Sequence, residues 1–196
     1  MTSLPDRLRL PLAVDAGAMA GEVAALARAD WVRHFVTQNY DGEWDVVPLR
    51  AQAGTTHPVM MIVPDPTASH FADTPFLAAC PAIGAALRRF RCPLACVRLM
   101  RLGPGSAIKE HRDLALSPED GTIRIHIPIL TNPGVDFRLN GTHVPLEAGT
   151  AWYLRLTDPH SVSNRGDTER IHLVIDATVD PWLSALLADT AAQAAP

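Results

Sequence analysis

A histidine and an aspartate two residues apart, His111 and Asp113, have the spacing of two metal ligands. In an extended chain, residues i and i+2 point to the same side, so both side chains can approach one point. A second histidine, His160, follows Pro159 at the start of a predicted strand. Two imidazoles and one carboxylate leave three positions of a metal open, the arrangement of non-haem iron(II) oxygenases. For the His-x-Asp pair alone, a surface ion pair or a turn-capping aspartate is the alternative.

An arginine, Arg170, is expected beside the second histidine. Asn164-Arg165-Gly166 suits a three-residue hairpin loop with glycine in the left-handed position. Centring this hairpin on Arg165 pairs His160 with Arg170, and directly opposed residues share a face of a sheet. A guanidinium binds carboxylates bidentately, so Arg170 can hold the distal carboxylate of a 2-oxo acid bound to iron. The alternative is a surface arginine in a cross-strand ion pair.

The segment Thr122–Leu130 alternates between apolar and polar residues, which predicts a strand. Four isoleucines form one face and must be core: Ile123, Ile125, Ile127 and Ile129. Arg124 and His126 lie on the other face, where they are costly unless paired, so we expect them to line a cavity and meet anionic groups. A solvated face is the alternative. His172 shares the parity of Arg170 and is interpreted as a satisfied core histidine.

The second half of the chain predicts short strands, and Asn140-Gly141 is a strong signal for a two-residue hairpin turn. The predicted strands are Ala95–Leu102, Thr122–Leu130, Val135–Leu139, Thr142–Leu146, Ala151–Leu156, His160–Ser163 and Arg170–Ala177. Asp180-Pro181 is expected to cap a closing helix over Trp182–Leu187. Several short strands at this spacing indicate a mainly β sandwich or jelly roll.

The first half predicts helices and irregular segments that pack on one sheet. Asp15 is expected to N-cap a helix over Ala16–Ala29, and a second helical stretch begins at Pro75, breaks at Pro81 and resumes to Phe90. A short strand is predicted for Val46–Arg50. We therefore expect an N-terminal region (residues 1–92) on a jelly-roll core (93–188), a frayed tail (189–196), and one structural domain overall.

Composition excludes several classes of protein. The chain has 196 residues, is 47% hydrophobic and 19% charged, and carries a formal net charge of −4. Without a run of basic residues, a nucleic-acid partner is not expected. No stretch is long and apolar enough to span a bilayer, and Pro5, Asp6 and Pro11 interrupt any signal peptide, so a cytoplasmic protein without a membrane partner is expected. Cys80, Cys92 and Cys96 are interpreted as buried reduced thiols rather than half of a zinc site.

Taken in order, these motifs resemble the aspartyl/asparaginyl β-hydroxylase family over about residues 97–187. The segments that carry the resemblance are His111-Arg-Asp113, Arg124-Ile-His126-Ile-Pro, Gly149-Thr-Ala-Trp-Tyr, Pro159-His160-Ser-Val-Ser-Asn and Arg170-Ile-His-Leu-Val-Ile-Asp176. The resemblance implies a double-stranded β-helix of cupin-like type that uses Fe(II), 2-oxoglutarate and O₂ to hydroxylate a C–H bond, releasing succinate and CO₂. It also implies that His111 and His160 bind the metal, that Arg170 clamps 2-oxoglutarate, and that Arg124 and His126 contact its other carboxylate or the substrate.

Asp113 narrows the choice among the types of enzyme in this family. The animal enzyme that modifies EGF-like domains lacks a carboxylate at this position, whereas the free-proline cis-4-hydroxylase type has a complete triad similar to this one. The expected substrate is then a free amino acid, a carrier-bound aminoacyl group or a residue in a peptide. Two alternatives stay open: a cupin-type metal enzyme that does not use 2-oxoglutarate, and a cupin-like binding module without catalysis.

Overall fold

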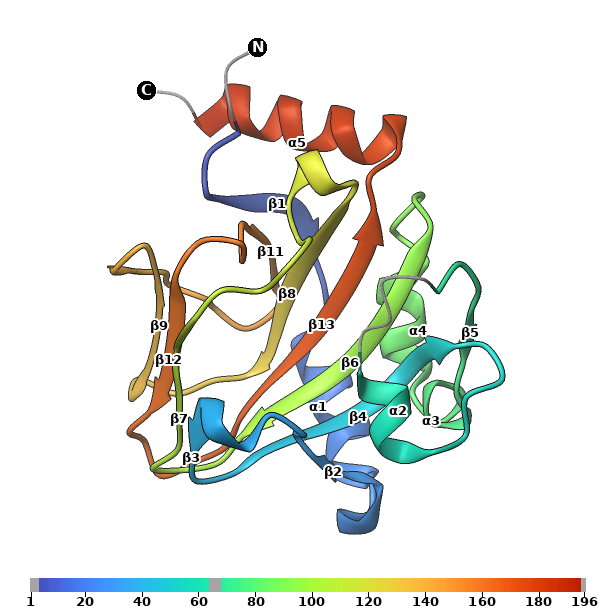
Figure 1. Ribbon diagram of the computed structural model, residues 1–196, viewed down its shortest axis with the longest axis vertical. Helices are drawn as coiled ribbons and strands as arrows, with labels where there is room; N and C mark the ends of the chain where they lie inside the picture. The colour runs from blue at the N-terminus through green and yellow to red at the C-terminus, as the bar shows by residue number, and fades with distance from the viewer. Residues whose placement is uncertain (1–3, 64–67, 195–196) are drawn as a thin grey trace.

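The protein folds into two antiparallel β-sheets that face each other (Figure 1). A computed structural model describes residues 4–63 and 68–194. The larger sheet has the order β1-β11-β8-β13-β6-β4-β2, with β5 paired to β4, and the smaller has the order β10-β9-β12-β7-β3. This is the mainly β, jelly-roll architecture that the sequence predicted.

The bounds of the strands are as follows. The larger sheet contains β1 (Arg7–Ala13), β2 (Val32–Arg33), β4 (Trp44–Gln52), β5 (Phe71–Asp73), β6 (Leu94–Leu102), β8 (Thr122–Leu130), β11 (Thr150–Leu154) and β13 (Arg170–Thr178). The smaller sheet contains β3 (Tyr40–Asp41), β7 (Ala107–His111), β9 (Val135–Leu139), β10 (Thr142–His143) and β12 (His160–Asn164).

The α-helices are α1 (Ala16–Ala25), α2 (Pro58–Ile62), α3 (Pro75–Ala78), α4 (Pro81–Leu87) and α5 (Pro181–Ala194), and three short 3₁₀ turns are η1 (Arg28–Asp30), η2 (Thr37–Asn39) and η3 (Pro118–Asp120). The helices α1, α4 and α5 pack on the outer face of the larger sheet, whereas Ile62 of α2 joins the cluster between the sheets. Met19 of α1, Ile83 of α4 and Leu183 of α5 are buried in one apolar cluster with the outward-facing side chains of β8 and β13. The predicted packing of helices on one sheet is thereby confirmed. In Figure 1, α5 lies across the end of the molecule near both termini.

Strand β8 shows how the alternating sequence divides the molecule into two cores. Its four isoleucines are at most 2% exposed and belong to the cluster under the helices, as predicted. Arg124 and His126 point the opposite way, into the space between the two sheets. A second apolar cluster, which includes Phe137, Val162 and Val174, fills much of that space. The two-residue period of β8 therefore places its polar face inside the molecule rather than in solvent.

The Asn140-Gly141 turn is confirmed. Leu139 pairs with Thr142, and both turn residues adopt positive φ, 51° for Asn140 and 72° for Gly141. These angles suit the tight turn whose twist matches the flanking strands, here β9 and β10.

The predicted hairpin at Asn164-Arg165-Gly166 is wrong. His160 pairs with His111 and Leu139 in the smaller sheet, whereas Arg170 pairs with Leu102 in the larger sheet. The buried Asn164 explains the crossing, because its side-chain amide donates to the carbonyl oxygens of Leu102, at 3.1 Å, and Gly103. These bonds fix the end of β12 against β6 while the chain passes from one sheet to the other.

The first half of the chain contributes more strand than predicted. The segment β1 pairs with β11 and buries Leu8 and Leu10, and β4 extends beyond the predicted Val46–Arg50 to pair with β6. The helix predicted for Ala16–Ala29 ends at Ala25, although Asp15 caps it as expected by accepting from the backbone of Ala18 at 2.9 Å.

The tail predicted to fray is largely helical. The helix α5 continues through Ala194, because Leu187, Thr190 and Ala191 turn toward the core under β1. Residues 195 and 196 of that predicted tail lie outside the described residues.

Two expectations from composition can be compared with the fold. Cys80, Cys92 and Cys96 are free and buried, and burial raises the pKa of Cys92 to about 11, consistent with reduced core thiols. Within residues 4–63 and 68–194, no helix combines the length and the apolar character needed to cross a membrane.

Candidate metal centre and anion pocket

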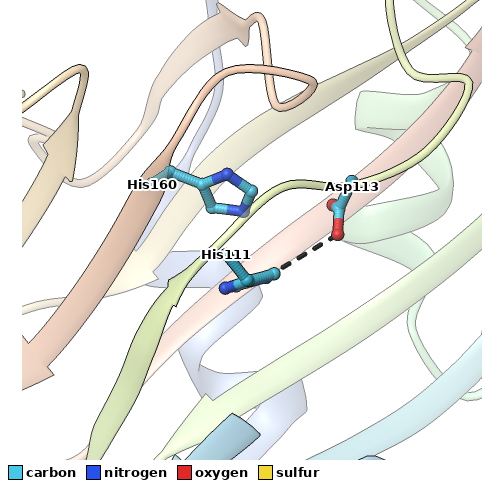
Figure 2. Close-up of side chains that lie close together, drawn as sticks. All are labelled: His111, Asp113 and His160. Atoms are coloured by element: carbon cyan, nitrogen blue, oxygen red, sulfur yellow. Dashed lines mark ion pairs between the residues drawn. The ribbon is translucent and has the colours of Figure 1, made fainter.

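Two histidines face each other across the smaller sheet. His111 ends β7 and His160 begins β12; the two residues are paired in the ladder, and their ring centroids lie 4.2 Å apart. Figure 2 shows both side chains directed into the same space, with Asp113 beside them. The approach of these residues therefore follows from strand pairing, which the sequence spacing between them could not reveal.

The hydrogen bonds of the two rings determine which nitrogens are free. Nδ1 of His111 lies 2.8 Å from the carbonyl oxygen of Lys109, and Nδ1 of His160 lies 3.0 Å from that of Asp158. A carbonyl oxygen only accepts, so both Nδ1 atoms carry a proton, and in the neutral form of each ring Nε2 presents the lone pair. Burial lowers the pKa of His160 and favours its neutral ring, and this effect outweighs the opposing one of the bond to Asp158. Nε2 of each imidazole is thus the nitrogen available to a metal.

A carboxylate completes the group. Asp113 follows β7, and its backbone N–H donates to the carbonyl oxygen of Leu156 at 2.8 Å. Its Oδ1 lies 3.7 Å from Nε2 of His111 (Figure 2), and the ligand atoms of His111, Asp113 and His160 all lie within 4.8 Å of one another. Two ligands at right angles on a metal are about 3 Å apart, so small side-chain movements suffice to bind an ion.

An ion-pair network lies next to this carboxylate. Arg124 of β8 donates from Nη1 to Oδ2 of Asp113 at 2.7 Å, and from Nε and Nη2 to the two oxygens of Asp176 at 2.6 and 3.0 Å. Arg98 of β6 donates to Oδ2 of Asp176 at 3.0 Å. Although burial opposes the charge, the two arginines lower the pKa of Asp176 to about 2. Arg124 therefore contacts carboxylates of the protein, where the sequence predicted contacts with a cosubstrate or substrate.

A second group contains Arg170, His172 and His126, all from the inner face of the larger sheet. Nη2 of Arg170 donates to Nδ1 of His172 at 2.7 Å, and Nδ1 of His126 lies 3.2 Å from that same nitrogen. Because Nδ1 of His172 accepts from a guanidinium, His126 must carry its proton on Nδ1. Its Nε2 is then a lone pair, and Nε2 of His172 carries a hydrogen.

Each of these three side chains has a buried nitrogen atom that makes no hydrogen bond to the described residues. Nε of Arg170 and the Nε2 atoms of His126 and His172 are buried without a partner in residues 4–63 and 68–194. In the part of the chain that the structure describes, no carboxylate pairs with Arg170, and burial alone lowers the pKa of this guanidinium to about 9. A buried cation without an anion is unfavourable, so this pocket fits an anionic ligand. His172 is buried in the core as predicted, but it is not fully satisfied, because its Nε2 has no partner among the described residues.

The anion pocket and the metal centre belong to the same space between the sheets. The ring of His126 lies 5.8 Å from that of Phe137, which in turn stacks on His160 at 6.4 Å. Arg170 was predicted to share this space by pairing with His160. The structure brings it there by another route, because the even-numbered residues of β13 face the smaller sheet.

Sequence reasoning missed three residues of this region. Arg98 is 1% exposed and keeps Nε and Nη2 without a partner, and Asp176 joins it to Arg124. His34 stacks on Trp44, with ring centroids 3.5 Å apart. Burial first, and then the charges of Arg98 and Arg124, lower the pKa of His34 to about 4, so its ring is neutral beside the site. Only Asp176 had a sequence signal, the parity it shares with Arg170.

Fold and site together define a class of protein: a cupin-like jelly roll with a His-x-Asp…His group between its sheets. Within this class, the chain belongs to the aspartyl/asparaginyl β-hydroxylase family, whose sequence model matches residues 15–179. This match covers both candidate ligand segments and the strands that carry the anion pocket.

Solved structures share the fold at low sequence identity. A 2OG-Fe(II) oxygenase family oxidoreductase from Burkholderia pseudomallei is 16% identical, with a TM-score of 0.53 over 88% of this chain and 85% of that chain. The non-haem α-ketoglutarate-dependent epimerase SnoN from nogalamycin biosynthesis is 18% identical, with a TM-score of 0.51 over 87% and 76%. A collagen prolyl hydroxylase of Paramecium bursaria Chlorella virus-1 is 10% identical, with a TM-score of 0.50 over 89% and 97%.

Proposed function

We propose that this protein is an Fe(II)- and 2-oxoglutarate-dependent dioxygenase that hydroxylates an unactivated C–H bond of an amino acid, aminoacyl or peptidyl substrate. His111, Asp113 and His160 are the proposed ligands, and membership of a hydroxylase family supports the reaction class. The observation that carries the proposal is that two Nε2 atoms and a carboxylate converge near a buried arginine that has no carboxylate partner among the described residues. Such a site suits a metal together with an anionic cosubstrate.

Arg170 is the proposed anchor for 2-oxoglutarate. Its guanidinium can bind the distal carboxylate, while His172 accepts one of its hydrogens and holds the fork in place. Nε2–H of His172 is a further buried donor without a partner among the described residues. This assignment leaves one face of the metal free of protein ligands.

The residues of the chain then position and protect the reacting groups. Bound iron and O₂ supply the oxidising chemistry, in which 2-oxoglutarate becomes succinate and CO₂. The backbone carbonyls that accept from Nδ1 of His111 and His160 hold both rings with Nε2 directed toward the proposed metal. The apolar side chains of Phe137, Val162 and Val174 border the site and exclude water.

The charge balance of the interior favours a substrate with a free carboxylate. Arg98, Arg124 and Arg170 face the inter-sheet space, where Asp113 and Asp176 oppose them, which leaves one positive charge. A metal dication and a 2-oxoglutarate dianion cancel, so the excess positive charge persists when both are bound. The free Nε and Nη2 of Arg98 are the donors available for a substrate carboxylate. These donors favour a substrate with a free carboxylate over one whose carboxyl group is bound in a carrier ester or a peptide bond.

Succinate formation from 2-oxoglutarate, measured with Fe(II) against a panel of amino acids, their carboxamides and short peptides, tests this proposal. We expect turnover that depends on both iron and a substrate carboxylate. A metal enzyme without 2-oxoglutarate would transform a substrate with no succinate produced. A binding module would bind manganese and N-oxalylglycine in a thermal-shift assay and show no turnover with any compound.

A further inference from the structure

The candidate ligand Asp113 differs from the two histidines in how its backbone is held. His111 and His160 belong to paired strands, whereas Asp113 lies in the segment that follows β7. The next residue, Leu114, is 90% exposed, and Ala115 has a positive φ of 54°. The direction of the Asp113 carboxylate is therefore not fixed by a sheet, and side-chain contacts must orient it.

One guanidinium makes that contact. Arg124 donates to Oδ2 of Asp113 at 2.7 Å, while Oδ1 faces Nε2 of His111 at 3.7 Å (Figure 2). With Oδ2 engaged by the arginine, Oδ1 is the oxygen left for a metal. The two oxygens of Asp113 thus differ, because Oδ2 accepts from Arg124 while Oδ1 faces the histidines, an arrangement that suits binding of a metal through a single oxygen.

Asp176 in turn fixes the arginine. Arg124 and Asp176 are directly opposed on β8 and β13, and the guanidinium engages both carboxylate oxygens through Nε and Nη2. This fork-to-fork geometry determines the plane of the guanidinium, so that Nη1 points to Asp113. Arg98 makes a further bond to Oδ2 of Asp176 and helps to keep this 5% exposed carboxylate charged.

We propose that Asp176 is a positioning residue of the metal centre, which acts through Arg124 to present a single oxygen of Asp113 to the metal. This inference rests on the proposed function and extends it to a residue that contacts neither metal nor cosubstrate. Partners of metal ligands typically contribute about 10–100-fold to metal affinity when they are removed, which sets the expected size of the effect.

The test is the affinity of the metal-free protein for Mn(II) or Co(II), measured by calorimetry without any turnover. Asp176→Asn keeps the shape of the side chain but removes its charge, and we expect its affinity to fall by about 10–100-fold. Asp45→Asn is the matched control, because Asp45 is also a buried carboxylate paired with an arginine of β6, Arg101, and its ion pairs do not include Asp113, Arg124 or Asp176. Its metal affinity should match that of the unmodified protein even if its melting temperature falls.

A double variant separates positioning from general destabilisation. If Asp176 acts through Asp113, the variant Asp113→Ala/Asp176→Asn should bind metal as weakly as Asp113→Ala alone, because residues in one network are not additive. Additive losses would overturn the inference. Unchanged affinity in Asp176→Asn beside a weakened Asp113→Ala would also overturn it and leave the proposed metal centre intact. Unchanged affinity in Asp113→Ala would instead reject the proposed function.

The variant Arg124→Gln provides the same test if Asp176→Asn does not fold. It removes the link between the two carboxylates while Arg98 still pairs with Asp176. We expect a metal affinity as weak as that of Asp113→Ala, to within a few-fold. Wild-type affinity in Arg124→Gln would show that Asp113 is oriented without the network, and would overturn the inference.

Discussion

His111 and His160 are cross-strand partners whose Nδ1 atoms are each engaged by the carbonyl oxygen of the residue two positions earlier. These two similar bonds direct both Nε2 atoms into one space, and the ring centroids lie 4.2 Å apart. Because the bonds come from the backbone, substitutions of other side chains should leave the orientation of the rings unchanged. The two histidines are held by the backbone, so substitution of the third proposed ligand, Asp113, is the most informative test of the metal centre.

Removing the carboxylate should impair metal binding. We predict that Asp113→Ala weakens iron binding and lowers turnover at least about tenfold, because it removes the anionic protein ligand. Metal titration of the metal-free protein and succinate formation measure the two effects. The control is Asp136→Ala, a carboxylate that pairs with Arg138 and His143 at the β9–β10 hairpin. Full activity and unchanged iron affinity in Asp113→Ala would eliminate the proposed triad.

Removing the proposed anchor should affect the cosubstrate selectively. Loss of one partner of a buried charge pair costs on the order of 2–5 kcal/mol, so Arg170→Ala should raise the apparent KM for 2-oxoglutarate about thirtyfold or more. Arg170→Lys should recover only part of the loss, since a point charge does not reproduce the fork. The dependence of succinate formation on 2-oxoglutarate concentration provides the KM.

Two controls accompany the anchor variants. Metal affinity should change little in Arg170→Ala, and the exposed Arg165→Ala should behave like the unmodified protein. An unchanged KM in Arg170→Ala would place the cosubstrate carboxylate on another residue, with Arg98 the first to examine, because it also keeps unpaired donors.

The proposed substrate carboxylate can be tested by changing ligand and protein together. For an amino acid that supports turnover, we predict that its carboxamide is at least about tenfold poorer in kcat/KM, because a charge-assisted hydrogen bond is lost. In the Arg98→Gln variant, the difference in kcat/KM between the amino acid and its carboxamide should largely disappear. Equal use of acid and amide by the unmodified protein would argue for an aminoacyl or peptidyl substrate.

Several parts of the fold were predictable from local pattern. The two-residue period of Thr122–Leu130 specified both the strand and its buried face, and Asn140-Gly141 specified its turn, because each depends on neighbouring residues alone. The segment β1 is harder to predict although Leu8 and Leu10 alternate, because Pro5 and Pro11 flank and interrupt this short apolar pattern.

What local pattern could not supply were contacts between strands distant in sequence. The hairpin at Asn164-Arg165-Gly166 failed because the Asn164 side chain binds carbonyls of β6, a strand it meets only in the folded molecule. The convergence of His111, Asp113 and His160 was predicted from residue types, but Arg98 joins Asp176 across two strands whose pairing no spacing reveals. His34 likewise approaches the site through its stack on Trp44.

The helical end of the chain makes a prediction about stability. Leu187 is 1% exposed in the core under α5, so Leu187→Ala should lower the free energy of unfolding by about 2–5 kcal/mol. Asp189→Ala, on the exposed side of the same helix, should change it by less than about 0.5 kcal/mol. Chemical denaturation of both variants measures the difference. Equal free energies of unfolding for the two variants would mean that the Leu187 side of α5 does not pack on the core.

The most direct test of the central claim is a crystal structure of the protein with Mn(II) and 2-oxoglutarate. We predict that the metal lies within about 2.3 Å of Nε2 of His111, Nε2 of His160 and one carboxylate oxygen of Asp113, near usual ligand distances. The guanidinium of Arg170 should bind the distal carboxylate of 2-oxoglutarate. A metal bound elsewhere, or without Asp113 among its ligands, would contradict the assignment.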